Sequence, residues 1–317
     1  MTVTDAKCEV MDGVLAVNKE ASWTSHDVVA KVRQVLGGAK VGHGGTLDPA
    51  ATGLLPLLIG KGTRIAEYLV HWDKEYRAQL RLGETTDTLD ATGIILERQS
   101  TEHLTRGAVC EAVSKFRGEI QQMPPMYSAV KVDGVPLYRS ARAGKTIARE
   151  ARTVIIHALE VLDVAGQDVT LRVVCSKGTY IRTLCADIGS VLGVGGHLHA
   201  LERTRVGPLT LDRTLTVNEI VRCQRLGELA AHVSSLDEVL CDLPALVVDR
   251  RAAERVCHGA PIGWSNVLSV KDGEIQRKAE MPVRLHDDNG RLLAVGRLSP
   301  QGVDRITIEK VLATDLR

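Results

Sequence analysis

The stretch Val41-Gly42-His43-Gly44-Gly45-Thr46-Leu47-Asp48-Pro49-Ala50-Ala51-Thr52-Gly53 separates two well-patterned segments of the chain. We predict a loop here, because closely spaced glycines and a proline disfavour regular helix and strand. His43 and Asp48 are residue types that carry out acid–base chemistry near neutral pH. The stretch is therefore either a tight connector with an Asp turn or part of a functional site, and its local pattern favours neither.

The segments around this loop predict both strands and helices. Before it, a short buried strand at 14–17 precedes a helix that Thr24 caps and that ends at Gly37-Gly38. After it, the apolar run 54–59 contains Pro56, which indicates an edge or irregular strand. The run 74–83 then alternates, with Tyr76 at one end of its apolar face.

Further along, the pattern predicts a helix at 105–116 and strands at 153–164, 169–175 and 197–207. Strands and helices in irregular order, with several hairpin-like pairs, predict an α+β fold built on a mixed, mainly antiparallel sheet. The pattern of predicted elements changes near Leu243. From there on, short strands and a hairpin turn at 287–290 indicate a small mostly-β module. We therefore expect two domains, 1–240 and 243–317.

Composition sets limits on compartment and partners. The 317 residues include 44% hydrophobic and 25% charged residues, with a formal net charge of +1, so an RNA partner requires a local basic patch. The seven cysteines form no C-x-x-C pair, which favours a reducing compartment. We find no apolar leader at the N-terminus and no run of about 18 apolar residues. A cytoplasmic protein without a membrane span is expected.

The segment 131–152 is the clearest candidate for such a patch. It holds six basic residues against Asp133 and Glu150, with Tyr138 among them. The alternative is a solvated helix face that carries charge only for solubility. The basic residues are Lys131, Arg139, Arg142, Lys145, Arg149 and Arg152.

Several of these motifs together resemble the TruB type of pseudouridine synthase. The stretch 41–53 is similar to that family's catalytic motif, and Lys74-Glu75-Tyr76, the polar loop from Arg81 to Asp90, Met126 to Lys131, and Ser176 to Arg182 follow in the family's order. The resemblance is strong over about 11–210, and the C-terminal module resembles a PUA-type RNA-binding domain more weakly. Gly44 and Ala50 depart from the pattern, where Thr and Leu are common, and Gly44 is expected to loosen the loop.

The resemblance implies an isomerase, a tRNA pseudouridine(55) synthase. Such an enzyme flips out a uridine in the T loop of tRNA, breaks its C–N glycosidic bond and remakes it as C–C, without a metal or organic cofactor. By their match to the family, Asp48, Tyr76 and Arg182 are the catalytic candidates. Asp48 would act at the sugar as nucleophile or through a glycal route, Arg182 would pair with it and keep it ionised, and Tyr76 would stack on the base and accept a proton.

Five further residues are substrate-binding candidates, and for His43, Tyr180 and Leu201 the resemblance assigns the contact. His43 would fill the gap left by the flipped base, whereas Tyr180 and the backbone of Leu201 would touch the uridine. Asp90 belongs to a loop that we expect to be structured by Asx-type turns rather than to bind Ca²⁺, since the EF-hand order is missing. Lys19 supports the first strand or a phosphate, or it is a surface lysine. The segment 131–152 falls at the family's RNA-gripping segment.

Two other functions stay open at this point. An RNA-guided synthase of the dyskerin type shares the catalytic core, but it works with partner proteins and a guide RNA. A tRNA chaperone would bind and fold tRNA without catalysis, and one protein could do both. The presence of Asp48, Tyr76 and Arg182 favours an enzyme, and the basic segment 131–152 favours one that acts alone on the T arm of tRNA, as a monomer.

Overall fold

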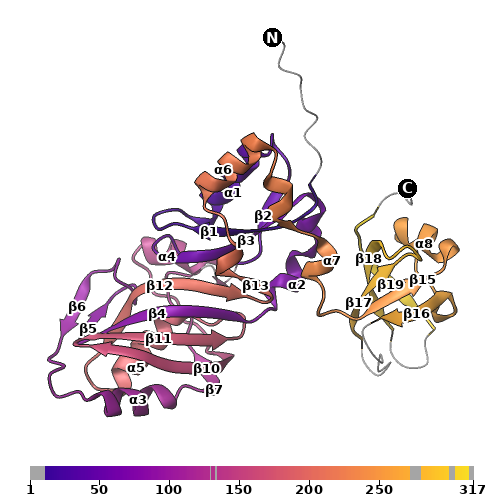
Figure 1. Ribbon diagram of the computed structural model, residues 1–317. Coiled ribbons are helices and arrows are strands. Elements are labelled where there is room, and N and C mark those ends of the chain that lie inside the picture. Colours follow the sequence, from indigo (N-terminus) through magenta and orange to yellow (C-terminus); the bar gives the residue numbers. More distant parts are fainter. Residues whose placement is uncertain (1–10, 129, 133, 272–279, 300–303, 314–317) are drawn as a thin grey trace, which may run out of the picture.

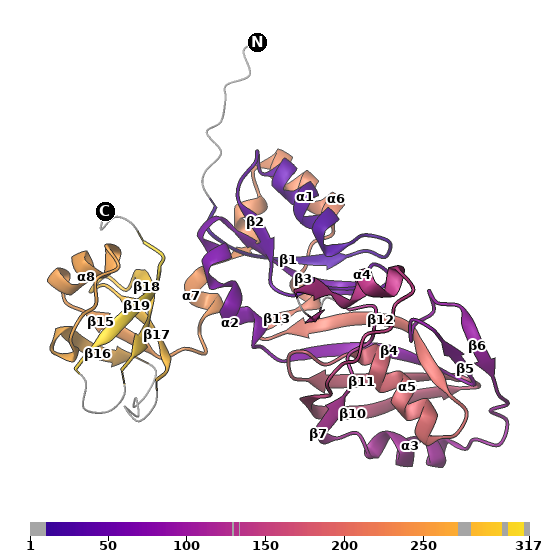
Figure 2. The same cartoon turned by 180° about the vertical axis from the view of Figure 1, so that it is seen from behind.

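The computed structural model describes residues 11–128, 130–132, 134–271, 280–299 and 304–313. Figures 1 and 2 show a large body built around one long twisted sheet, with a smaller β-rich body beside it. The N-terminal residues examined for a leader, together with Cys8 and Asp133, lie outside the described residues. No described helix is both long enough and apolar enough to cross a membrane.

The large body is organised by a ten-stranded sheet in the order β14-β1-β3-β12-β4-β11-β10-β7, with β2 on β3 and β13 on β12. Its pairs are antiparallel except for a short parallel contact between β3 and β12, so the mixed, mainly antiparallel sheet that we predicted is confirmed. The strands are β1 (Gly13–Lys19), β2 (Val41–His43), β3 (Thr52–Ile59), β4 (Lys74–Leu82), β7 (Gly118–Gln122), β10 (Arg152–Ala165), β11 (Asp168–Cys175), β12 (Gly196–Val206), β13 (Leu209–Thr210) and β14 (Val233–Ser234).

Two helix pairs bury the two halves of this sheet in separate cores. Helices α1 (Ser25–Val35) and α6 (Val217–Leu226) pack with β1 and β3, and both begin at capping boxes. Helices α3 (Arg106–Ser114) and α5 (Ile181–Val191) pack with β4, β10 and β11. Tyr76 and Leu201 contact both cores, so they mark the boundary between the two halves.

The predicted loop 41–53 is correct for its middle and wrong at both ends. Val41–His43 forms β2 and Thr52 begins β3, so the irregular part covers 44–51. Gly42 in β2 pairs with β3, and Gly53 in β3 pairs with β12. This pairing keeps both glycines in strands despite their low strand propensity. Pro56 is likewise not on an edge strand, since β3 pairs with β1 along its whole length and Pro56 falls between the short pairings with β2 and β12.

The basic segment is not one helix. Lys131–Val132 (β8) and Val135–Pro136 (β9) pair as a short hairpin, and Leu137–Arg142 forms the helix α4. The residues from 143 to 151 have no regular structure. Buried Leu137 attaches α4 to the body, whereas Lys131, Arg139, Lys145 and Arg152 are exposed. The alternative of a single solvated helix is therefore wrong, because only Leu137–Arg142 is helical.

Smaller elements complete the large body. The hairpin of β5 (Glu84–Thr86) and β6 (Ile95–Arg98) leaves the end of β4, and the 3₁₀ helix Gly60–Ile65 leads into α2 (Ala66–Val70). The 3₁₀ helix Leu211–Arg213 precedes α6, and after α6 the 3₁₀ helix Leu229–His232 and the helix α7 (Leu236–Val239) lead out of this body.

The smaller body has its own sheet, in the order β16-β15-β17-β18-β19, and its own core under α8 (Arg250–Cys257). A further apolar cluster joins it to α2 and α7, and Leu69, Leu240, Val295 and Leu312 belong to that cluster. Buried Arg284 donates to Asp237 at 2.7 Å across the same junction. The strands are β15 (Ala245–Val248), β16 (Val267–Lys271), β17 (Pro282–His286), β18 (Leu292–Leu298) and β19 (Ile306–Val311), and the 3₁₀ helix Trp264–Asn266 precedes β16.

Candidate active site

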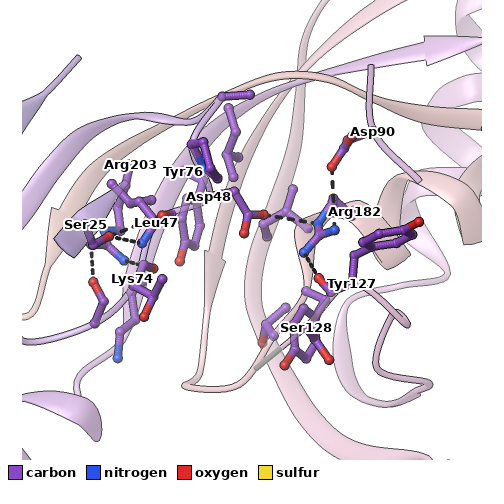
Figure 3. Close-up of a pocket in the computed structure, with 18 of the residues that line it drawn as sticks. Ser25, Leu47, Asp48, Lys74, Tyr76, Asp90, Tyr127, Ser128, Arg182 and Arg203 are labelled. Atoms are coloured by element: carbon purple, nitrogen blue, oxygen red, sulfur yellow. Dashed lines mark hydrogen bonds and ion pairs between the residues drawn. The ribbon is translucent and has the colours of Figure 1, made fainter. Parts of the chain in front are cut away.

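A pocket of about 880 Å³ opens where the two halves of the large sheet meet. This is within the usual size range of ligand pockets. Residues 44–50 of the loop line it together with the turn that precedes α5 (Figure 3). Asp48, Tyr76, Asp90, Tyr180, Arg182 and Leu201, which the resemblance selects, all line this pocket.

Hydrogen bonds to neighbouring elements fix the loop that carries Asp48. The Ser25 hydroxyl at the start of α1 accepts from the Leu47 amide at 2.9 Å and donates to the Leu47 carbonyl at 3.2 Å. Gly44 N–H donates to the Pro56 carbonyl at 2.8 Å, and a Cβ at Gly44 would lie 3.1 Å from Leu69. The loosening expected from Gly44 is therefore wrong, because the backbone is bonded and Leu69 occupies the adjacent space.

Asp48 and Arg182 point toward each other across the pocket (Figure 3). Arg182 Nε lies 3.1 Å from Asp48 Oδ2, so the ion pair expected from the resemblance is present. Its Nη1 lies 3.5 Å from Asp90 Oδ2, and its Nη2 donates to the Tyr127 carbonyl at 2.8 Å. These partners hold the guanidinium in place, whereas 45% of the Asp48 side chain stays open to the pocket.

Arg182 favours the ionised form of Asp48, as we expected, but burial acts more strongly in the opposite direction. Burial raises the pKa of Asp48 above its ordinary value, and Asp90 adds to that rise, while Arg182 and Lys19 oppose it. The two cations reduce the shift without reversing it. Arg182 therefore limits the cost of the carboxylate charge at this position but does not hold the pKa of Asp48 below its usual range.

Asp90 sits in a loop of the predicted Asx type. Its Oδ1 accepts from the Thr92 amide at 3.0 Å and from the Thr88 hydroxyl at 2.7 Å, which leaves Oδ2 facing Arg182. Among the residues that the structure describes, no group of His, Cys, Asp and Glu side chains could hold a metal ion. Asp90 is thus placed to orient Arg182 in the pocket wall.

Tyr76 projects from β4 at the boundary between the two cores. Its ring is half-buried and lines the pocket. Burial raises the pKa of Tyr76, and the charge and hydrogen bond of Arg203 oppose that rise. Tyr180 caps α5 from the other side of the pocket, with its amide donating to Gln122 Oε1 at 2.9 Å.

Lys19 is fully buried, so the surface alternative is wrong. Its amino group donates to the carbonyls of Glu20 at 2.9 Å, Trp23 at 2.8 Å and Pro49 at 3.1 Å. Burial lowers the pKa of Lys19 to about 8, while the negative charge of Asp48 opposes that change. The Pro49 bond attaches β1 to the loop directly beside Asp48, which makes Lys19 a support of the loop.

His43 ends β2 behind the loop and is not part of the pocket lining. Its ring meets His26 edge-on at 5.5 Å between centroids, and its Nδ1 is buried without a hydrogen-bond partner among the described residues. Burial, followed by His26 and Arg203, lowers the pKa of His43. His26 does line the pocket, so His43 is connected to the site only by its ring contact with His26.

Sequence patterns missed three polar residues in the pocket wall. Lys74 is buried at the end of β4, and burial lowers its pKa to about 8. Ser128 is 95% buried, and its hydroxyl has no hydrogen-bond partner among the described residues. Arg203 is buried on β12. Lys74 and Ser128 lie within motifs that we had identified without giving either residue a role, whereas only the strand pairing reveals Arg203.

Comparisons with known proteins place these motifs in a family. The N-terminal domain model of TruB family pseudouridylate synthases matches residues 33–181, and the model of the tRNA pseudouridylate synthase B C-terminal domain matches 182–248. The chain is 43% identical over 289 residues to a tRNA pseudouridine synthase B of Burkholderia mallei, covering 91% of this chain and 94% of that one. It is 44% identical over 282 residues to that of Thermobifida fusca, covering 85% and 94%.

Solved structures add a likeness in fold. A Cbf5-Nop10-Gar1 complex contains a chain that is 30% identical, with a TM-score of 0.76, and the match covers 96% of this chain and 86% of that one. An H/ACA RNP bound to a substrate RNA containing 2'-deoxyuridine gives 27% identity and a TM-score of 0.74, with 96% and 87% covered.

Proposed function

Because the chain belongs to the TruB family of pseudouridylate synthases, which isomerise uridine in tRNA, we propose that it acts on uridine 55 of the T loop. The observation that carries the proposal is the Asp48–Arg182 pair at 3.1 Å in a pocket that also presents Tyr76. We propose further that it works alone, as a monomer, on cytoplasmic tRNA.

Asp48 supplies the group that acts at the sugar. Cleavage of a glycosidic bond leaves an electron-poor sugar carbon, which a carboxylate stabilises or attacks. The carboxylate is open to the pocket, while Arg182 faces it from the opposite wall. Attack by Asp48 forms a C–O bond to the sugar and releases the uracil; the rotated uracil then forms the C–C bond and displaces Asp48.

Tyr76 and Tyr180 hold the flipped base. Unstacking a base costs a few kcal/mol, and stacking on an aromatic ring returns roughly 1–3 kcal/mol. Both rings line the pocket beside Leu201. Once the new C–C bond has formed, the proton on the same base carbon must leave, and the acceptor that we assign is Tyr76 in its deprotonated form, which becomes a neutral phenol in that step. His43 keeps the RNA open from behind the loop, through His26.

RNA affinity comes from the exposed cations of 131–152. Among the described residues, no ion pair joins Lys131, Arg139, Lys145, Arg149 or Arg152 to an acidic side chain, so their charge is available to phosphates. The segment connects to the pocket wall through Tyr138, whose amide donates to the Ser128 carbonyl at 3.1 Å. Binding of the RNA backbone and of the target base would therefore occur on one continuous surface.

The domain 243–317 adds a second RNA contact of the PUA type. Its separate sheet and core support an independent module, attached through α2 and α7. Arg250 and Arg251 are exposed at the start of α8. Charge reversal by Arg250→Glu with Arg251→Glu should weaken tRNA binding in a filter assay; unchanged affinity would remove α8 from the contact.

The test of the function is direct. Purified protein is incubated with an unmodified tRNA transcript, and pseudouridine is mapped by position. We expect one new pseudouridine, at position 55, without guide RNA or partner protein, and a protein peak of monomer mass in light scattering. Product at other positions, or product only after guide RNA is added, would favour the RNA-guided alternative. Binding without product would favour a chaperone.

A further inference from the structure

Arg203 is a buried cation in the wall of the pocket. It lies on β12 with 2% of its surface exposed, and among the described residues no carboxylate forms an ion pair with it. Buried charges are normally paired, because desolvation of a lone charge is costly. The position of Arg203 therefore calls for an explanation beyond folding.

The guanidinium donates to the backbone of the Asp48 loop. Its Nη2 donates to the Gly45 carbonyl at 3.1 Å and its Nη1 to the Thr46 carbonyl at 3.2 Å. The Nε–H donates to the Leu54 carbonyl at 2.7 Å on β3, beyond the loop. One planar group thus joins the residues before Asp48 to the strand that follows it.

Arg203 is also the cross-strand neighbour of Tyr76. Arg203 and Tyr76 are directly opposite each other on the antiparallel pair β12 and β4, so their side chains lie on one face of the sheet. Both residues line the pocket. The positive charge of Arg203 opposes the effect of burial on the pKa of Tyr76.

The backbone of Arg203 is also locked in place. Gly53 is its partner in the parallel contact between β3 and β12, and a Cβ on Gly53 would lie 2.4 Å from the Arg203 carbonyl oxygen. Gly53 has φ +96°, which favours glycine. The backbone of β12 at Arg203 therefore packs directly on Gly53, at the end of the Asp48 loop.

We propose that Arg203 is a positioning residue that sets the Asp48 loop and the Tyr76 phenol at one fixed separation, so that both meet the same uridine. The carboxylate and the phenol act in different steps, on the sugar and on the base. A residue that bonds the loop through its rigid guanidinium and pairs with Tyr76 through its strand keeps their relative position through those steps. The inference rests on the proposed function.

The first test compares Arg203→Lys and Arg203→Met with wild type in single-turnover assays at saturating enzyme. Misplacement by about 1 Å costs roughly 10²-fold in rate, so we expect a loss of that order in Arg203→Met and a smaller loss in Arg203→Lys, which keeps the charge. The dissociation constant for tRNA should stay within about twofold. A rate equal to that of wild type in Arg203→Met would overturn the inference.

A matched control separates positioning from loss of stability. Arg284 is also a buried arginine that donates to backbone carbonyls and Asp237, but it lies at the junction with the smaller body, outside the pocket. Arg284→Lys should lower the melting temperature and leave the rate unchanged at temperatures where it is folded. An equal rate loss in Arg284→Lys would show that destabilisation alone explains the effect.

Two measurements distinguish positioning from a purely structural role of Arg203. They are the pH dependence of the rate and the rate of a double variant with Tyr76→Phe. Removing the cation in Arg203→Met should shift the limb of the rate profile that depends on Tyr76 to higher pH, whereas Arg284→Lys should leave it in place. In the double variant with Tyr76→Phe, the two rate losses should not multiply. Fully multiplied losses, or an unmoved limb, would overturn the inference; an inactive wild type would overturn the proposed function itself.

Discussion

The Asp48 loop and the basic segment 131–152 are both irregular stretches rich in functional residues, yet they are held in opposite ways. Buried Lys19 and Arg203 bond the loop's own carbonyls, and Ser25 bonds Leu47. The basic segment is attached mainly through Leu137, and its Lys131, Arg139, Lys145 and Arg152 are exposed. A rigid stretch suits chemistry, which needs fixed distances, whereas exposed cations suit affinity, which needs charge. Variants in the two should therefore fail differently.

The largest effect should follow Asp48→Asn. Loss of the carboxylate removes the group that acts at the sugar, so the single-turnover rate should fall by about 10⁴-fold or more, as when other enzymes lose a nucleophile. Binding should stay near that of wild type, because the basic segment is untouched. Retained turnover in a quench-flow assay on tRNA transcript would remove Asp48 from the mechanism.

A smaller effect of the opposite kind should follow Arg139→Ala combined with Lys145→Ala. Each lost phosphate contact should reduce the slope of log affinity against log salt by about 1, with little change in rate at saturating enzyme. Lys31→Ala with Arg222→Ala, on exposed positions of α1 and α6, is the control with the same change in charge. An identical salt slope in both pairs would contradict a gripping role for this segment.

Ser128→Ala probes the wall between the two regions. A buried hydroxyl without a partner costs roughly 1–3 kcal/mol. Removing the hydroxyl, which leaves the methyl side chain of alanine, should therefore raise the free energy of unfolding, measured in urea. If the hydroxyl bonds the substrate, tRNA affinity should fall by about fivefold, equivalent to about 1 kcal/mol. Lower stability together with unchanged affinity would show that Ser128 bonds a structural partner instead.

The smallest effect is the dependence of stability on pH at Asp48. Its pKa is raised in the folded protein, so the folded state binds more protons than the unfolded state as pH rises above the ordinary value of 3.8. The charge of Asp48 therefore costs stability above that pH. Asp48→Asn should be the more stable protein at neutral pH, and the difference should vanish in acid. Equal urea midpoints at every pH would contradict this.

Sequence patterns predicted much of the fold because its strands and caps are local. The alternation at 74–83 and the cap at Thr24 correspond to β4 and α1. Pro56 was misplaced because its surroundings depend on which strands flank β3. The loop ends were misplaced because β2 exists only through its pairing with β3.

The candidate site divides in the same way. Asp48, Tyr76 and Arg182 were found through motifs, and the structure brings them to one pocket. Arg203 carried no motif, since its importance arises from a register that sets it opposite Tyr76. Lys19 could be recognised as a support of the loop only once its bond to Pro49 was seen.

The most direct test of this account measures the rate and the tRNA dissociation constant on one transcript for Asp48→Asn and for Arg139→Ala with Lys145→Ala. The account predicts that the first variant loses rate and keeps affinity, while the second loses affinity, more strongly at higher salt, and keeps rate. If both quantities fall together in both variants, the division of labour between the loop and the basic segment is wrong.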